Sequence, residues 1–290
     1  MTDEEKKLTN RRFYKAGEEA SFADAKLNTT PQTESPSYLL AFRDTDFLLR
    51  EELRPVRFQL ELLKTEMLME EAEIGSTLVV YGSARIPSPE HVEAVRATAT
   101  TPERAKVVES LIAKSKYYEE ARKLAHIAST CAIVEKGMRQ FVVCSGGGPS
   151  IMEAANRGAM EAGADSIGLN IVLPHEQAPN PYVTPDLSFQ FHYFALRKMH
   201  FLLRARAVAV FPGGFGTFDE FFELLTLIQT GKMQPIPILL FGRDYWNRVI
   251  NFQALAEEGV INENDTALFH WVETAEDGWQ KIVEFYDLEC

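Results

Sequence analysis

A glycine-rich segment with a carboxylate close behind it is the part of this sequence most able to do chemistry. The segment is Pro212–Thr217, which contains Gly213, Gly214 and Gly216, and Glu220 follows it. The apolar residues 205–211 predict a buried strand before it, and residues 221–228 predict a helix after it. Glycines let the backbone approach a ligand, and the first helical turn offers free N–H groups and the positive end of the helix dipole. This order predicts an anion site beside a carboxylate, which is typical of chemistry on a phosphorylated substrate.

Thr217 and Glu220 also fit a capping box, in which a threonine caps the helix and a glutamate three residues later bonds back to it. In that interpretation Glu220 is purely structural. Against it, residues 212–216 hold a proline and three glycines, which is more than a plain turn requires. We therefore favour a ligand-binding role for the loop and a chemical role for Glu220, with capping as the alternative.

A second small-residue turn, residues 82–85, follows the predicted strand 77–81. The hydroxyl of Ser83 could bond a substrate, whereas Arg85 could bind an anion or face solvent. Ligands of open α/β sheets bind outside the carboxyl ends of the strands. Because all three glycine-bearing turns of this chain follow predicted strands, we expect Gly82 and Ser83 to share one site with Glu220.

The third turn, residues 145–150, contains Gly146, Gly147 and Gly148 after the predicted strand 141–144. It matches neither the dinucleotide-binding GxGxxG pattern nor a Walker A loop, so we expect no nicotinamide cofactor. Its glycines could let a nucleotide lie against the backbone or could only allow close packing. Ser150 and Glu153 fit a capping box, which gives Glu153 a structural role.

A basic pair, Arg197-Lys198, lies on a helix predicted at 194–203. Arg197 and Arg204 are two helical turns apart and therefore share a face. Such charges often only solvate a helix surface. This helix, however, leads into the strand before the glycine-rich segment, and arginine suits the bidentate binding of oxyanions. Arg197 is therefore a candidate for binding a phosphate or a sugar.

Composition limits the classes of partner. The chain has 290 residues, is 46% hydrophobic, and carries a formal charge of −12, so a substantial core is expected, and nonspecific binding to nucleic acid or anionic membrane is not. No apolar run reaches membrane-spanning length, and the first residues lack the apolar core of a secretory signal. These features predict a cytoplasmic protein.

Cysteine and histidine spacing predicts neither a disulfide nor a metal. The three cysteines lack CxxC spacing, which fits a reducing cytosol and offers no disulfide framework. We expect Cys144 to be a buried core residue. The six histidines form no HxxxH or HExxH pattern, so no metal site is predicted. Neither a metal nor a redox cofactor is indicated.

Strands and helices alternate along most of the chain. Residues 1–37 are polar and predict a flexible tail, and residues 38–74 predict a helical extension that Pro55 breaks or restarts. Residues 75–290 predict one α/β domain with a doubly wound, mostly parallel sheet. Residues 86–103 look like an insertion, residues 104–137 are predicted as one helix or two, and further helices are predicted at 151–162, 245–257 and 276–285. The remaining strands are predicted at 166–172, 187–192 and 235–241.

Together these residues resemble the Lonely-guy (LOG) family of cytokinin riboside 5′-monophosphate phosphoribohydrolase-like proteins, often mislabelled as lysine decarboxylases. The family pattern Pro-Gly-Gly-x-Gly-Thr-x-x-Glu is matched in full by Pro212–Glu220. Arg197-Lys198, Gly82-Ser83 and Gly146–Gly148 match further pieces in the same order. The resemblance covers roughly residues 77–240, while the residues around the Arg-Lys pair depart from compact members and leave the preferred base open.

The resemblance implies a Rossmann-like fold and hydrolysis of a nucleoside 5′-monophosphate, AMP-like in our prediction, to a free base and ribose 5-phosphate. It implies that Arg197 and Glu220 are catalytic, and that the substrate is a small molecule. It also implies a homodimer or higher homo-oligomer. The substrate-binding residues that it adds or shares with the turns are Gly82, Ser83, Gly146, Gly147, Gly148, Lys198, Gly213, Gly214, Phe215, Gly216, Thr217 and Thr226.

Two other classes compete with this one. A non-catalytic nucleotide- or pterin-cofactor carrier would share the glycine-rich turns, although it would not need the combination of Arg197 and Glu220. A pyridoxal-phosphate decarboxylase would need a Schiff-base lysine, and no residue is indicated for that role, because Lys198 already has a simpler one.

Overall fold

A computed structural model describes residues 13–25, 28–174 and 178–290 of the chain. Their contacts divide the protein into two compact units, Met1–Leu60 and Glu61–Cys290, with the division inside helix α3 (Arg54–Glu71). Each unit is described by itself. No helix among the described residues is both long and apolar enough to cross a membrane.

The first unit contains short helices. Its elements include α1 (Ala16–Ala25) and α2 (Thr45–Leu48), and the amino-terminal part of α3 belongs to it. Arg43 donates to Asp24 at 2.8 Å. The helix α1 falls within a stretch that the sequence suggested was a flexible tail. Pro55 is the second residue of α3, where its missing N–H costs no helical hydrogen bond.

The second unit is built on a seven-stranded sheet with the order β6-β5-β4-β1-β7-β8-β9. All neighbouring strands pair in parallel, which confirms the predicted doubly wound, Rossmann-like α/β fold. The strands are β1 (Thr77–Tyr81), β4 (Val142–Ser145), β5 (Ser166–Ile171), β6 (Ser188–Phe191), β7 (Ala205–Val210), β8 (Ile238–Phe241) and β9 (His270–Val272).

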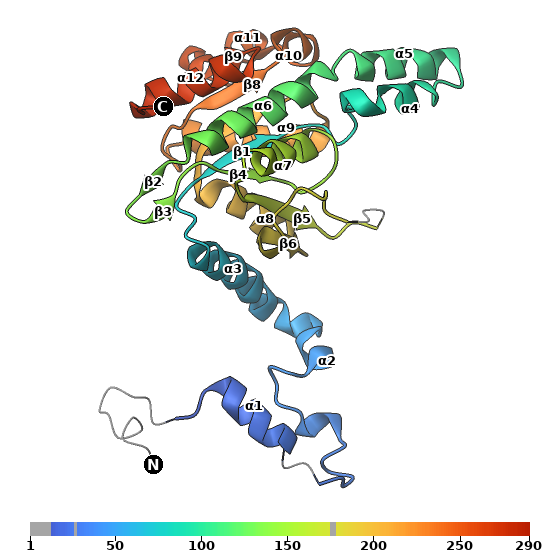
Figure 1. Cartoon of the computed structure of the whole chain (residues 1–290), viewed down its shortest axis with the longest axis vertical. Coiled ribbons are helices and arrows are strands. Elements are labelled where there is room, and N and C mark those ends of the chain that lie inside the picture. Colours follow the sequence, from blue (N-terminus) through green and yellow to red (C-terminus); the bar gives the residue numbers. More distant parts are fainter. Residues whose placement is uncertain (1–12, 26–27, 175–177) are drawn as a thin grey trace. The chain divides into compact units, whose positions relative to one another are not determined.

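The central strands of this sheet are buried along their whole length. They are buried because helices cover both faces of the sheet. Leu78 and Val80 of β1 face the core shared with α6, α7 and α12, and α6 and α7 lie in front of the sheet in Figure 1. Tyr81 faces the opposite side, where its ring meets Phe201 of α8 edge-on at 5.1 Å. The helices are α4 (Val92–Arg96), α5 (Pro102–Ile112), α6 (Lys116–Cys131), α7 (Ile151–Glu161), α8 (Phe194–Leu203), α9 (Phe215–Gln229), α10 (Arg243–Val249), α11 (Phe252–Glu257) and α12 (Ala275–Tyr286).

The strand order reverses at the centre of the sheet. From β1 the chain moves outward through β4, β5 and β6, and then returns to place β7 on the other side of β1. A crevice forms at such a switch point, outside the carboxyl ends of the two central strands. The turn at residues 82–85 and the glycine-rich segment after β7 are therefore brought together.

Several elements differ from those expected. The two helices α5 and α6 agree with the one or two predicted over 104–137, but a small hairpin that was not predicted begins there, β2 (Val134–Glu135) with β3 (Met138–Arg139). The helix expected at 245–257 is two helices, α10 and α11. The edge strand β9 was not predicted, because three residues are too short to show a pattern.

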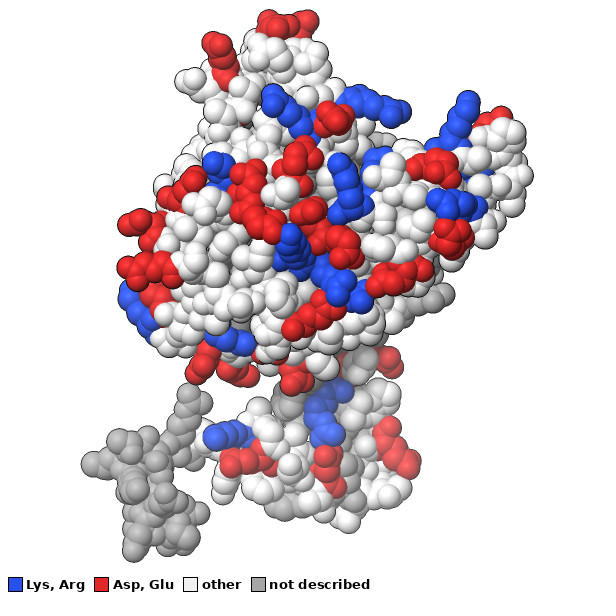
Figure 2. Space-filling view, turned by 45° about the horizontal axis from the view of Figure 1, so that its top comes forward, with Lys and Arg blue, Asp and Glu red and all other residues white. Residues whose placement is uncertain are grey.

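Acidic and basic side chains interleave over the face of the protein shown in Figure 2.

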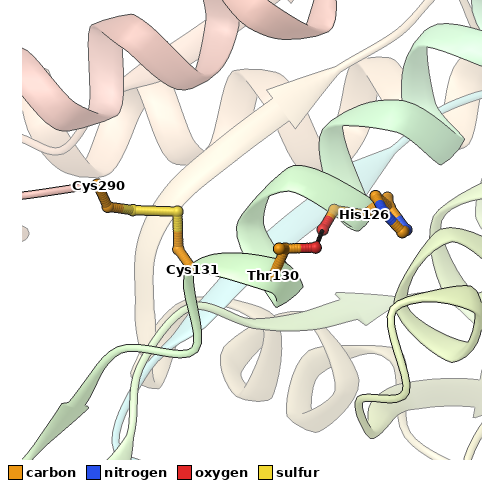
Figure 3. Close-up of a disulfide and its surroundings, with 4 residues drawn as sticks. All are labelled: His126, Thr130, Cys131 and Cys290. Atoms are coloured by element: carbon orange, nitrogen blue, oxygen red, sulfur yellow. Dashed lines mark hydrogen bonds between the residues drawn. A yellow bond between two sulfur atoms is a disulfide. The ribbon is translucent and has the colours of Figure 1, made fainter.

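The expectation of no disulfide is wrong. Cys131, at the end of α6, is bonded to Cys290, after α12, with the two Cα atoms 6.0 Å apart (Figure 3). The sequence hides this pair because the cysteines are 159 positions apart and meet only when α12 packs against α6. Cysteine usage therefore gives no support for a reducing compartment. Cys144 is free and buried, as predicted.

Candidate active site

A cavity of about 650 Å³ lies at the carboxyl ends of β1 and β7. One wall is the turn after β1, another is the glycine-rich segment, and the Arg197 and Glu220 side chains also border it. The lining residues are Gly82, Ser83, Ala84, Arg85, Met152, Arg197, Gly213, Gly214, Phe215, Gly216, Thr217, Phe218, Glu220 and Tyr245.

The amino terminus of α9 opens into this cavity. Gly214 is the N-cap and accepts a bond from the N–H of Phe218 at 3.0 Å, but it has no side chain to cap the helix. Helix geometry leaves the N–H groups of Phe215, Gly216 and Thr217 without intrahelical acceptors. These groups and the positive end of the α9 dipole suit a phosphate.

The capping-box alternative for Thr217 and Glu220 is wrong. The helix begins at Phe215, so Thr217 lies inside its first turn and its side chain is buried. The carboxylate of Glu220 faces Arg197 instead of reaching back to a cap.

The three glycines of the segment differ in what surrounds them. A Cβ at Gly213 would lie 2.1 Å from Oγ1 of Thr217, so the fold itself requires glycine there. A Cβ at Gly214 or Gly216 would meet no atom within 4 Å, although both residues line the cavity. A side chain at either position would therefore occupy space that a ligand can use. The side chain of Phe215 is 97% exposed at the same edge.

Arg197 and Glu220 form an ion pair at the cavity, with Nη1 and Oε1 3.4 Å apart and only 12% and 14% of the side chains exposed. Arg197 also donates through Nε to the carbonyl oxygen of Leu169 at 2.6 Å, and its guanidinium lies over the ring of Phe201. Gly146 leaves room for this arginine, because a Cβ there would lie 2.6 Å from its Nη2. The guanidinium is thus held on three sides.

Burial raises the pKa of Glu220 to about 7, against the attraction of Arg197, which lowers it. Asp219 adds to the rise and Lys198 opposes it. A carboxylate with a pKa near neutrality, beside an anion site in a cavity, is typical of a group that binds or transfers protons.

Lys198 lies one residue from this pair, but its side chain turns to the flank of α9. Its Nζ bonds Asp219 at 3.0 Å and Glu223 at 3.1 Å. Burial lowers the pKa of Lys198, but the bonds and charges of Asp219 and Glu223 outweigh burial and raise it. Lys198 lies outside the cavity lining, and so does Thr226, which is exposed and donates to the carbonyl oxygen of Phe222.

The Gly146–Gly148 turn also lies outside the lining. Gly147 has a φ of +71°, and a Cβ there would lie 2.4 Å from Oδ1 of Asn170. The carbonyl oxygens of Gly147 and Gly148 accept bonds from Nδ2 of Asn180. These contacts are tight packing, so the turn supports the site by making room for Arg197.

The predicted capping box at Ser150 and Glu153 is wrong. The hydroxyl of Ser150 donates to the carbonyl oxygen of Ile86, and the carboxylate of Glu153 accepts a bond from the hydroxyl of Tyr118. Glu153 keeps a structural role, but its partner is a helix that precedes α7 in the chain.

Gly82 and Ser83 do reach the cavity. The N–H of Ser83 donates to the carbonyl oxygen of Pro212 at 3.1 Å, which joins the first turn to the glycine-rich segment. Arg85 lines the cavity too, and it is also exposed to solvent. Among the described residues, no group of three or more His, Cys, Asp or Glu side chains is arranged to hold a metal ion.

Two lining residues outside the predicted turns and segments were missed from the sequence. Tyr245, on α10, donates its hydroxyl to the carbonyl oxygen of Gly213, and Met152 is the second residue of α7. A signal existed for Tyr245, because it follows Gly242 after another strand of the sheet, where ligands are expected. The side chain of Met152 carries no comparable signal.

Part of this cavity lies in a region that is similar to known proteins. Residues 152–282 match the family model described as possible lysine decarboxylase, and that region includes Arg197, the glycine-rich segment and Glu220. A cytokinin riboside 5′-monophosphate phosphoribohydrolase of Arabidopsis thaliana is 24% identical over 152 residues, covering 51% of this chain and 67% of that protein. Residues 152–282 of this chain are thus similar to proteins of the Lonely-guy family.

The chain is similar to bacterial proteins as well. A pyrimidine/purine nucleotide 5′-monophosphate nucleosidase of Escherichia coli K12 is 31% identical over 121 residues. The match covers 37% of this chain and 25% of that protein, so the chain spans about a quarter of its length. Among solved structures, a molybdenum cofactor binding protein from Rippkaea orientalis has 16% identity and a TM-score of 0.43, covering 73% of this chain and 98% of that one.

Proposed function

We propose that this protein is a nucleoside 5′-monophosphate nucleosidase that releases a free base and ribose 5-phosphate. The observation that carries the proposal is the buried Arg197–Glu220 pair in the cavity into which α9 opens. The anion site suits the 5′-phosphate, and the pair suits the ribose. The names of the relatives support the same class of reaction.

The chemistry follows from the charges of the site. When the bond between C1′ and the base breaks, its electron pair leaves with the base and positive charge builds on the ribose. The Glu220 carboxylate stabilises that charge and accepts a proton from the water that adds to C1′. The departing base takes a proton from solvent and Glu220 returns its proton to solvent, so that one water is consumed in each turnover. Phosphate binding at α9 supplies binding energy that positions the bond.

In this proposal Arg197 orients Glu220 and the ribose hydroxyls. Gly213, Gly214, Gly216 and Thr217 hold the phosphate, with Gly82, Ser83 and Phe215 around it. Lys198 acts from the flank of α9, through the charge of Glu220. The substrate is AMP-like, and the site of action is the cytoplasm.

Lys198 does not suit the role of the Schiff-base lysine in a decarboxylase dependent on pyridoxal phosphate. Its Schiff-base lysine would need a lowered pKa so that the amine is neutral. The pKa of Lys198 is raised, and its ammonium is engaged by two carboxylates.

The test is to incubate the purified protein with AMP, GMP, CMP, UMP and IMP and to measure free base and ribose 5-phosphate by chromatography. Both products are expected from at least one nucleotide. Glu220→Gln should abolish release, whereas Glu257→Gln, an exposed glutamate at the end of α11, should not. Calorimetric binding of nucleotides with no release from any would overturn the proposal in favour of a carrier.

The proposal also includes self-association. In the second unit, α3 exposes Leu63 and Met67, and α8 exposes Met199 and Leu203. Contacts between ionisable side chains hold these two helices side by side. Exposed apolar side chains on adjacent helices are typical of surfaces that bind protein, and a second copy of the chain is the occupant we propose.

A further inference from the structure

The second-unit part of α3, residues 61–71, holds α8 by both ends. Helix α8 has no acidic residue in its first turn, and its N-cap residue Tyr193 provides no side-chain cap. Glu61 of α3 holds the two residues that lead into the helix, accepting bonds from the N–H of His192 at 2.8 Å and of Tyr193 at 3.3 Å. A carboxylate at a helix amino terminus also complements the helix dipole.

The other end of α8 is held by two more carboxylates of α3. Glu66 contacts Nδ1 of His200 at 3.3 Å and Arg204 at 3.2 Å, and Glu70 contacts Arg204 at 3.3 Å. Arg204 also donates to the carbonyl oxygen of Ile74. The position of α8 along its own axis is thus fixed between Glu61 and the Glu66–Glu70 pair.

The first of these contacts leads directly to the candidate catalytic arginine. The N–H of Arg197 donates to the carbonyl oxygen of Tyr193 at 3.1 Å, and the N–H of the same Tyr193 donates to Glu61. The guanidinium of Arg197 is 3.4 Å from Glu220, which is long for a hydrogen bond. A small shift of this helical turn would therefore change the contact by which Arg197 lowers the pKa of Glu220.

We propose that Glu61 is a positioning residue for Arg197, and that the helix before the α/β domain is part of the catalytic apparatus. The inference rests on the proposed nucleosidase function for its kinetic consequence. The phosphate site is the first turn of α9, whereas Glu61 bonds the turn that begins α8. Glu61 therefore acts on the reaction step and not on phosphate binding.

The variants are Glu61→Ala, Glu61→Gln and the control Glu71→Ala. Glutamine keeps an oxygen that can accept one of the two bonds. Glu71 is an exposed glutamate on the same helix, so its loss removes the same charge. We expect Glu61→Ala to lower kcat by about ten- to a hundredfold with KM within about twofold, since a misplacement near 1 Å can cost that much. Glu61→Gln should recover most of the loss, and Glu71→Ala should match the wild type.

A second readout separates positioning from general destabilisation. The pKa of Glu220 is set by burial first, then by Arg197 and Lys198 on α8 and by Asp219 and Glu223 on α9. If the guanidinium of Arg197 moves away from Glu220 in Glu61→Ala, the pKa of Glu220 should rise, because Arg197 lowers it. Carbon-13 NMR of the glutamate carboxyls, assigned with Glu220→Gln, measures that pKa directly, and circular dichroism at the assay temperature shows that the variant is folded.

The outcomes are distinct. A lower kcat together with a raised Glu220 pKa in folded Glu61→Ala supports the proposal. An unchanged Glu220 pKa, or an equal loss of kcat in Glu71→Ala, overturns it. If the wild-type protein turns over no nucleotide, the proposed function fails, yet the NMR titration still decides whether Glu61 positions Arg197.

Discussion

Burial and nearby cations act in opposite directions on the pKa of Glu220, and its ionisation should appear in the dependence of the rate on pH. Burial raises its pKa to about 7, and Arg197 and Lys198 pull it down. If the carboxylate is the active form, kcat/KM should rise as the pH increases through about 7, because this ratio reports the pKa values of the free enzyme. Below that range the group is protonated and cannot stabilise a cationic ribose.

The matched variant is Lys198→Met. Removing a cation that lowers the Glu220 pKa should move the rise in kcat/KM to higher pH, with little change in the plateau. A profile measured from about pH 5 to about pH 9 brackets this shift. A rise at the same pH in both proteins would mean that another group controls the rate.

Gly216 gives a prediction in which stability and affinity change in opposite directions. It is the second residue of α9, and a Cβ there would meet no protein atom within 4 Å. Alanine favours helix over glycine by up to about 1 kcal/mol, so Gly216→Ala should raise the melting temperature. Because the added methyl group enters the cavity, KM for the nucleotide should increase.

Gly17→Ala provides the comparison. Gly17 is the second residue of α1, and a Cβ there also meets nothing within 4 Å. This variant should leave KM unchanged. If Gly216→Ala also leaves KM unchanged while binding is measured directly by calorimetry, the phosphate does not lie against that turn.

At the scale of elements, the disulfide between α6 and the end of α12 should stabilise the second unit. Linking residues that far apart reduces the entropy of the unfolded chain, and a disulfide typically contributes about 2–4 kcal/mol. Thermal unfolding with dithiothreitol should therefore occur at a lower temperature than without it. In Cys131→Ser, dithiothreitol should not lower the unfolding temperature further. An unfolding temperature of the wild type that is the same with and without dithiothreitol would contradict the prediction.

The sequence predicted the long, strongly patterned elements and missed those that depend on tertiary contacts. The apolar run of β1 and the helix α8 are visible in the chain, since burial on both faces of a strand and helical spacing leave local patterns. The strand β9 and the hairpin β2–β3 have elements of two or three residues and leave none. The Cys131–Cys290 pair depends on the packing of two helices distant in sequence.

The part of the candidate site that a tight glycine-rich turn determines could be predicted from the sequence. Gly213 and Gly214 follow from the need for a tight turn after β7, and Arg197 and Glu220 from their place beside it. The sequence could not show that Gly147 serves packing, because its partner Asn170 lies on another strand. Nor could it show that Thr217 is inside the helix and not its cap, because the start of α9 is set by the turn before it.

At the scale of the whole molecule, we predict that the protein self-associates through the exposed apolar side chains of α3 and α8. The variant that tests this is Met67→Lys, which places a charge among those side chains without altering a buried position. Light scattering should give a homo-oligomer for the wild type and a smaller species for Met67→Lys. Lys64→Ala, at an exposed position of the same helix, should behave as the wild type.

A monodisperse wild-type monomer at assay concentration would contradict this prediction. An oligomer that Met67→Lys leaves intact would place the interface elsewhere on the molecule.

The strand order also determines when the site can exist during synthesis. The central strand β1 leaves the ribosome early in the second unit, whereas its neighbour β7 comes only after β4, β5 and β6. Until β7 pairs, β1 has one open edge, and the turn that carries Gly82 has no glycine-rich segment to face. A growing chain therefore holds one wall of the cavity without the other, and its open edge is exposed to other chains for that interval. A ligand of the cavity can stabilise the nascent fold only late in translation, once α9 has been made.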